Sequence, residues 1–143
     1  MKPLPHRYEV SIAGGPTGRV TLRSGGVPDL TTDAPVEFDG PGDAWSPEQL
    51  LLAAVESCFL LTFRSVARAS KLEFTSIAVE GEGVVDRVDG RTRFTEIVLR
   101  PRLALPAGVD ATRVRRALEK AEHACLVTAS LSTPVRLEPD VAG

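Results

Sequence analysis

The sequence has few of the residues that would place it in a membrane, in an oxidising compartment or on a nucleic acid. Only two of its 143 residues are cysteines and two are histidines, too few for a disulfide framework or a zinc site. The first ten residues lack the apolar core of a signal peptide, and no run of about twenty apolar residues follows. A net charge of −2 gives no basic surface for a phosphate backbone. We therefore expect a cytoplasmic protein that binds neither membranes nor nucleic acid.

The length and the order of the patterns predict one α+β domain covering residues 1–143. A chain of this length with 43% hydrophobic residues can bury a core of its own. Alternating strand patterns lie before and after one long apolar segment, and they do not alternate regularly with helices. No internal repeat, low-complexity tract or linker divides the chain.

The apolar segment from Ser46 to Leu72 is predicted to form the central helix. Ser46 is a preferred N-cap, Pro47 suits the first helical position, and Gln49 can complete a capping box. Eleven of the fourteen residues from 50 to 63 are apolar, which predicts a helix covered on nearly every side. Charged residues interrupt and end this run, so we do not interpret it as a membrane span.

Turn residues and the periodicity of apolar residues predict the remaining strands and a second helix. Strands are expected at Arg7–Ala13, around Val20 and Leu22, at Val27–Thr32, Pro35–Phe38, Ile77–Val85, Ile97–Leu105 and, as an edge strand, Thr133–Pro139. Asp89-Gly90 predicts the turn of a long hairpin. An amphipathic helix should begin after Asp110 and end near Cys125, and the tail Asp140–Gly143 is expected to be loose.

The two cysteines, Cys58 and Cys125, are interpreted either as inert core residues or as a redox pair. Cys58 lies inside the apolar helix, 67 positions before Cys125, and this spacing does not fix their separation in space. Glu56 is expected on the wetter side of the helix. His6 and His123 are interpreted as solvated side chains rather than catalytic bases.

Glu48 stands ten residues before Cys58, about 15 Å along a straight helix, so the two cannot touch within one helix. If two copies of the helix pack antiparallel across a two-fold axis, Glu48 approaches the partner's Cys58. A homodimer would also cover an apolar helix. Taken alone, Glu48 has a simpler role, because an acidic residue in the first turn favours the helix dipole.

Two stretches of the sequence form a recognisable pattern. The first combines Gly40-Pro41-Gly42, Ser46-Pro47-Glu48-Gln49-Leu50, Ala53-Ala54 and Cys58-Phe59, and the second is Lys120–Thr128. Both stretches resemble the OsmC/Ohr family (osmotically inducible protein C and organic hydroperoxide resistance protein) of thiol-dependent peroxidases. The resemblance covers essentially the whole chain. It implies an OsmC-like fold, with antiparallel sheets wrapped around a central buried helix, and an intertwined homodimer with two active sites at the subunit interface.

The resemblance also implies the roles of the active-site residues. Cys58 would be the peroxidatic thiol and Cys125 the resolving thiol, while Glu48 would pair with an arginine that activates Cys58. Pro16 stands where the family's arginine often follows the Gly-Gly turn, so Arg19 is the nearest replacement and Arg23 the second.

The implied reaction converts Cys58 to a sulfenic acid, forms a Cys58–Cys125 disulfide and ends with reduction by an external thiol or a lipoyl-type dithiol. It needs no metal, haem, flavin or other cofactor. A pocket built from residues 50–61 and Phe63 would favour organic hydroperoxides. The alternative is a dimeric OsmC-like protein that binds an apolar small molecule without turnover.

Overall fold

The computed structural model describes residues 1–142, and the chain divides into two compact units, Met1–Leu50 and the residues from Leu51 onward. The first unit contains an antiparallel sheet of β1 (Ser11–Ala13), β2 (Val20–Arg23) and β3 (Leu30–Thr32). The expected hairpin is confirmed, with shorter strands.

The strand expected at Pro35–Phe38 is wrong, because Val36–Phe38 forms a 3₁₀ turn, η1. Asp39 closes this turn in the left-handed conformation, with φ 62°, and its backbone N–H donates to the Val36 carbonyl. An Asp side chain tolerates this conformation better than most, so the chain turns here instead of extending.

Helix α1 (Pro47–Ala69) begins where the capping signals predict. The Gln49 N–H donates to Ser46 Oγ at 3.2 Å, and the Ser46 N–H donates to Gln49 Oε1 at 3.0 Å. This reciprocal pair satisfies two N–H groups at the helix N-terminus and fixes the first turn. The capping box is therefore confirmed.

A long antiparallel hairpin follows, made of β4 (Ser76–Val88) and β5 (Arg91–Ala104). The predicted turn is confirmed, with positive φ angles of 50° at Asp89 and 77° at Gly90 that suit a two-residue hairpin loop. Beyond the hairpin, α2 (Ala111–Ala124) is capped by Asp110, whose carboxylate accepts the Thr112 N–H at 2.9 Å. Cys125 separates α2 from the short α3 (Leu126–Ala129).

Two short strands complete the larger sheet. Strand β6 (Val135–Leu137) lies parallel to β5, within the expected edge strand. The loose tail expected at Asp140–Gly143 is wrong, because β7 (Asp140–Ala142) also pairs with β5 in parallel, while Gly143 lies outside the described residues. Pro101 stands between the stretches of β5 that pair with β6 and β7, at a point where no backbone donor is needed.

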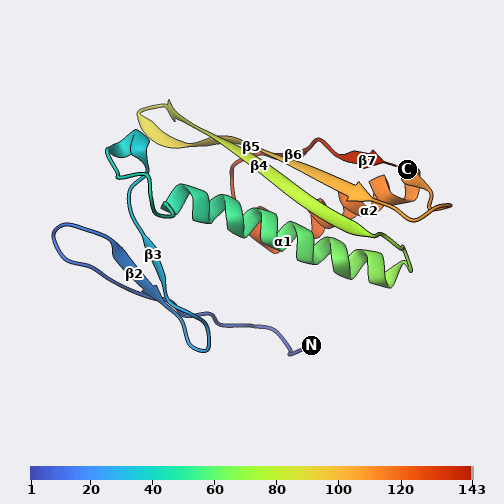
Figure 1. The fold of residues 1–143 in the computed structure, drawn as a ribbon, viewed down its shortest axis with the longest axis horizontal. Coiled ribbons are helices and arrows are strands. Elements are labelled where there is room, and N and C mark those ends of the chain that lie inside the picture. The colour runs from blue at the N-terminus through green and yellow to red at the C-terminus, as the bar shows by residue number, and fades with distance from the viewer. Residues whose placement is uncertain (143) are drawn as a thin grey trace. The chain divides into compact units, whose positions relative to one another are not determined.

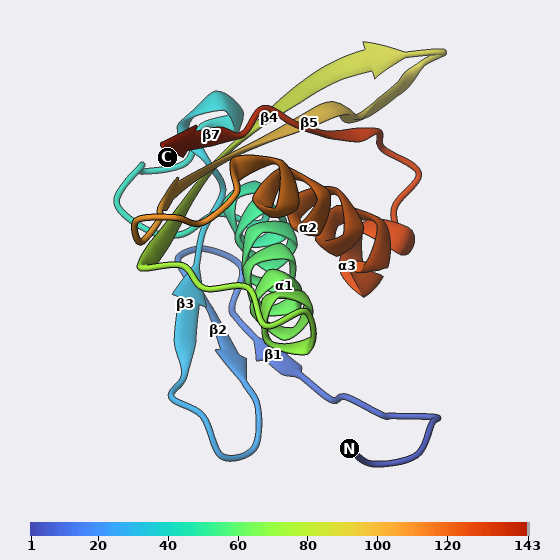
Figure 2. The same ribbon diagram turned by 90° about the vertical axis from the view of Figure 1, so that its right-hand side faces the viewer.

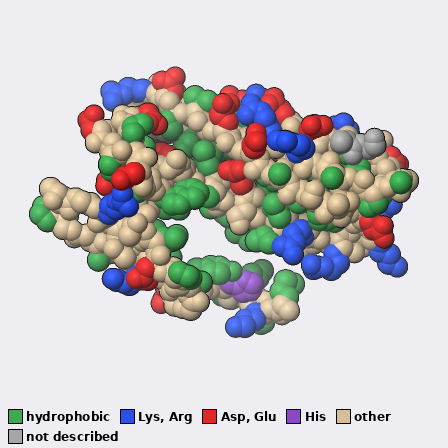
Figure 3. All heavy atoms as spheres, in the orientation of Figure 1, with side chains coloured by type: hydrophobic (Ala, Val, Ile, Leu, Met, Phe, Trp, Pro, Cys, Tyr) green, Lys and Arg blue, Asp and Glu red, His purple; other side chains and the backbone are tan. Residues whose placement is uncertain are grey.

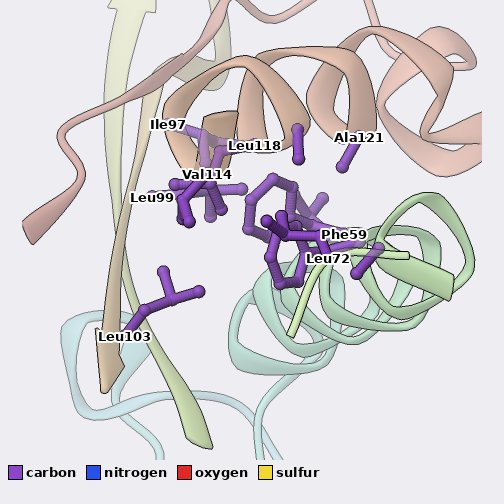
Figure 4. Packing of buried hydrophobic residues seen from close by; sticks show 12 residues of the cluster. Phe59, Leu72, Ile97, Leu99, Leu103, Val114, Leu118 and Ala121 are labelled. Carbon is purple, nitrogen blue, oxygen red and sulfur yellow. The ribbon is translucent and has the colours of Figure 1, made fainter. Parts of the chain in front are cut away.

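The core lies between α1, β5 and α2 (Figure 4). Helix α1 runs along one face of the β4–β5 hairpin, and α2 packs on the same face beside it (Figures 1 and 2). The buried residues of α1 are spaced four apart and form one stripe: Val55, Phe59, Phe63 and Ala67.

The rest of α1 is not covered in one chain, and Leu61 is 54% exposed. The expectation of cover on every side is therefore wrong for the single chain. By length and composition alone, α1 is one helix among the described residues that could cross a membrane, although its buried stripe belongs to the core.

The outer face of the larger sheet is charged. Basic and acidic side chains intermingle there in space-filling view (Figure 3). Arg136 bridges Glu96 and Glu138, both at 2.7 Å, and Arg100 binds Glu138 at 3.0 Å. One face of this sheet is thus solvated, while the other carries the helices and positions the site.

Candidate functional site

The two cysteines lie side by side although 67 positions separate them in the chain. Cys58 is half-buried in the middle of α1, and Cys125 is 1% exposed at the junction of α2 and α3. Neither cysteine forms a disulfide, and the two thiols are close enough that each shifts the pKa of the other. The chain bends at Cys125, which is extended between two helices, and this bend brings Cys125 to α1.

The surroundings of Cys58 favour its thiolate. Burial raises the pKa of Cys58, but hydrogen bonds to its sulfur outweigh this effect and leave the pKa lower than that of an ordinary thiol. The donors are the Val127 N–H, the Cys125 thiol, the Thr62 hydroxyl and the Leu126 N–H. Backbone donors near the start of α3 are thus aimed at the sulfur that they would stabilise as an anion.

Cys125 is affected in the opposite direction. Burial is the main reason that the pKa of Cys125 is raised, and the neighbouring Cys58 raises it further. Hydrogen bonds from Thr128 oppose both effects without overcoming them. Of the two adjacent sulfurs, Cys58 is therefore the one that ionises first, while Cys125 keeps its proton and can donate it.

A pocket of about 470 Å³ opens beside the Cys58 sulfur. It is lined by α1 and by the segment after Cys125, with Ala54, Ser57, Cys58, Leu61, Thr62, Ser65, Leu126 and Val127 contributing. The aliphatic side chains form an apolar wall next to a nucleophilic sulfur. The expected pocket is partly corrected, because Phe63 lies in the core and the α3 residues take its place.

Glu48 and Arg19 both lie in the first unit, and the structure does not pair them with each other. Glu48 lies in the first turn of α1, and its Oε2 is buried without a hydrogen-bond partner among the described residues. Arg19 pairs with Asp43 at 2.7 Å, and Arg23 pairs with Asp29 at 3.1 Å. The activation of Cys58 by one of these arginines stays a prediction.

Glu56 does not lie on the wetter side of the helix as expected. Its carboxyl group packs over Gly81 of β4, where a Cβ added to the glycine would stand 2.7 Å from it. Burial and the nearby Glu80 raise the pKa of Glu56. His123 is exposed in the last turn of α2, as expected for a solvated side chain.

The sequence interpretation missed the groups that surround the sulfurs. Thr62 follows Cys58 by four residues, so helical spacing alone could have found it. The N–H groups of Leu126 and Val127 carried no sequence signal, because only the bend after α2 aims them. Among residues 1–142 no cluster of three or more His, Cys, Asp or Glu side chains could hold a metal ion.

Comparison with known protein families identifies the family of the chain. The model described as "OsmC-like protein" matches residues 40–140, which include both cysteines and α1. The chain belongs to the OsmC-like family. The resemblance drawn from the two sequence stretches is thereby confirmed, and the family contains peroxiredoxins and organic hydroperoxide resistance proteins.

Two curated members of the OsmC-like family align over 121 residues. The uncharacterized protein YmaD of Bacillus subtilis is 28% identical, over 82% of this chain and 80% of YmaD. The peroxiredoxin OsmC of Escherichia coli is 27% identical, over 85% of this chain and 83% of its own. Both alignments span most of each chain.

Solved OsmC-like structures share the fold. An OsmC-like protein of unknown function from Vibrio cholerae superposes with a TM-score of 0.87, at 18% identity, over 94% of this chain and 99% of its own. An organic hydroperoxide resistance protein from Legionella pneumophila gives 0.77, at 22% identity, over 99% and 100%. The expected α+β OsmC-like fold with a central helix is confirmed.

Proposed function

We propose that this OsmC-like protein is a two-cysteine, peroxiredoxin-like peroxidase that reduces organic hydroperoxides. The observation that carries the proposal is the pair of neighbouring free thiols, one with a lowered and one with a raised pKa, beside an apolar pocket. A merely structural pair of core cysteines would not need donors aimed at one sulfur. Family membership and the name of the Escherichia coli relative support the same activity.

In the first step the Cys58 thiolate attacks the terminal oxygen of R–O–OH. The new S–O bond forms as the O–O bond breaks, which leaves Cys58 as a sulfenic acid and releases an alkoxide. The alkoxide takes a proton from water and leaves as the alcohol. Because only the thiolate is a good nucleophile, the donors around Cys58 raise the reactive fraction at neutral pH.

In the second step Cys125 attacks the Cys58 sulfenic acid. An S–S bond forms, the S–O bond breaks, and the hydroxyl group leaves as water with the Cys125 proton. The effect of each thiol on the pKa of the other supports this step, because it requires the two sulfurs to be neighbours. An external thiol or dithiol then donates two electrons and two protons to restore both thiols, and no cofactor is required.

The apolar lining of the pocket supports an organic hydroperoxide, rather than hydrogen peroxide, as the substrate. Its aliphatic residues Leu61, Leu126 and Val127 gain from contact with a hydrocarbon group, while hydrogen peroxide offers none. The competing reading, an OsmC-like protein that only binds an apolar molecule, draws on the same pocket. It leaves the donors around Cys58 without a purpose.

We further propose that the protein works as a homodimer. The apolar side of α1 is open in one chain, with Leu61 54% exposed, and a second copy would cover it. The unpartnered oxygen of Glu48 supports a charged partner for this carboxylate, and Arg19 is the residue we assign. Its guanidinium would exchange Asp43 for Glu48 when the site assembles.

The decisive experiment treats the reduced protein with cumene hydroperoxide and then alkylates it. We expect an intrachain Cys58–Cys125 disulfide in the wild-type chain, found by peptide mass spectrometry, and turnover with a dithiol. Cys58→Ser should abolish turnover, while Cys125→Ser should still form a Cys58 sulfenic acid that dimedone traps. The proposal fails if both wild-type thiols remain alkylatable after the peroxide, and binding without oxidation would favour the alternative.

A further inference from the structure

The hydroxyl of Thr62 lies against the sulfur of Cys58. The two residues are one turn apart on α1, and Thr62 Oγ1 stands 4.0 Å from Cys58 Sγ. Thr62 also lines the pocket beside the sulfur. The other donors to Cys58 come from Cys125 and α3, so Thr62 approaches the sulfur from its own helix.

This orientation differs from that of two hydroxyls that lie just after the ends of α1 and α3. Ser70 and Ser130 each donate to the carbonyl oxygen of the residue four places earlier, Val66 and Leu126. A hydroxyl in a helix commonly makes this bond to its own backbone. The hydrogen bond found for Thr62 goes instead to the side chain of the residue four places earlier.

We propose that Thr62 is a positioning residue that donates a hydrogen bond to the Cys58 thiolate and holds its sulfur toward the pocket. A charged sulfur attracts a hydroxyl proton more strongly than a neutral thiol does. A 4.0 Å contact is long for the resting thiol, and such contacts often tighten only when charge develops. The Thr62 hydroxyl is one of the groups that lower the pKa of Cys58.

The consequence for turnover rests on the proposed peroxidase function, but the ionisation of Cys58 can be measured without any peroxide. Three variants of the full chain separate the effects. Thr62→Val removes the hydroxyl and keeps the shape, and Thr62→Ser keeps the hydroxyl. Ser70→Ala is the matched control, because it removes a hydroxyl just after the end of α1 that bonds to the Val66 carbonyl and does not line the pocket.

The readout is the pH dependence of iodoacetamide alkylation at Cys58, followed on its own peptide by mass spectrometry. For Thr62→Val we expect the profile to move to higher pH and the rate at pH 7 to fall about threefold to tenfold. Thr62→Ser should restore most of the rate, and Ser70→Ala should leave the profile in place. Thermal unfolding of each variant checks that the fold is kept.

An unchanged profile in Thr62→Val overturns the proposal, whether or not the protein reduces peroxides. A shift that Thr62→Ser does not restore also overturns it, because the effect then comes from packing of the methyl group rather than from the hydroxyl. If the profile shifts as expected but peroxide never oxidises Cys58, the role of Thr62 stands and the peroxidase proposal fails.

Discussion

The two sides of α1 differ in what surrounds them. On the packed side, Val55, Phe59 and Phe63 are fully buried against β5 and α2 (Figure 4). On the open side, Cys58 is half-buried and Leu61 is 54% exposed around a pocket. One helix therefore carries both the centre of the core and the reactive sulfur.

This contrast between the two sides of α1 explains why Cys58 lies outside the packed core. A sulfur among the packed residues would lose solvent without gaining donors, and its pKa would rise, as it does for the buried Cys125. Partial exposure of Cys58 limits that penalty, and donors from α3 reverse it. The packed side supplies rigidity, while the open side gives access and chemistry.

The largest effect is expected for Phe59→Ala, which changes a residue next to Cys58 in the sequence but on the packed side of α1. Removing a fully buried ring should lower the free energy of unfolding by about 3–5 kcal/mol, measured by urea denaturation. Leu61→Ala is the control from the open side, and at a protein concentration low enough to dissociate the proposed dimer it should cost less than about 0.5 kcal/mol. Equal losses would mean that the two sides are not distinct.

Leu61→Asp tests whether a second copy covers the open side. If the proposed homodimer buries Leu61, a carboxylate there should weaken association at least about 100-fold, or about 2.7 kcal/mol. Sedimentation over a range of protein concentrations measures this change. Val88→Asp, at the tip of the β4–β5 hairpin, should not alter association. A wild-type chain that stays monomeric at all concentrations contradicts the dimer.

A smaller effect is expected in the alkylation rates of the two thiols. At pH 7 iodoacetamide should label Cys58 at least about tenfold faster than Cys125, because the pKa is lowered for the first and raised for the second. The thiolate ratio should fall as the pH rises above both pKa values. Unfolding in urea should equalise the two rates, which controls for peptide chemistry. Faster labelling of Cys125 in the folded protein would reverse the assignment of roles.

Local signals explain why much of the fold could be predicted. The capping pair of Ser46 and Gln49, the turn at Asp89-Gly90 and the cap at Asp110 each act through neighbours in the sequence. Strand β7 was not predictable in this way, because it depends on pairing with β5 nearly forty residues earlier. Such a three-residue strand has no periodicity of its own.

The site was predictable only in part for a similar reason. Helical spacing shows that Cys58 and Thr62 share a side, but spacing cannot bring Cys125 to the same place. That contact depends on the bend at Cys125, which is extended between α2 and α3. The family resemblance supplied the pairing, whereas the donor role of the Val127 N–H required the structure.

The smallest expected effect is a change in the pH dependence of stability, and it comes from Glu56. The carboxyl group of Glu56 packs over Gly81 of β4 instead of facing the pocket. Burial and Glu80 raise its pKa in the folded state, so the native protein binds more protons than the unfolded chain as Glu56 titrates. Stability from this group is therefore fully present below the unfolded pKa and is lost as the pH rises through the folded pKa.

Glu56→Gln should consequently stabilise the protein at pH 8 by about 0.5 kcal/mol, a modest gain because the side chain is partly solvated. At pH 4, where the wild-type carboxyl group is largely protonated, the gain should shrink toward zero. Urea denaturation at both pH values measures the difference, and the exposed Glu73→Gln serves as the control. A gain that grows as the pH falls would show that Glu56 is stabilised as an anion and would contradict the raised pKa.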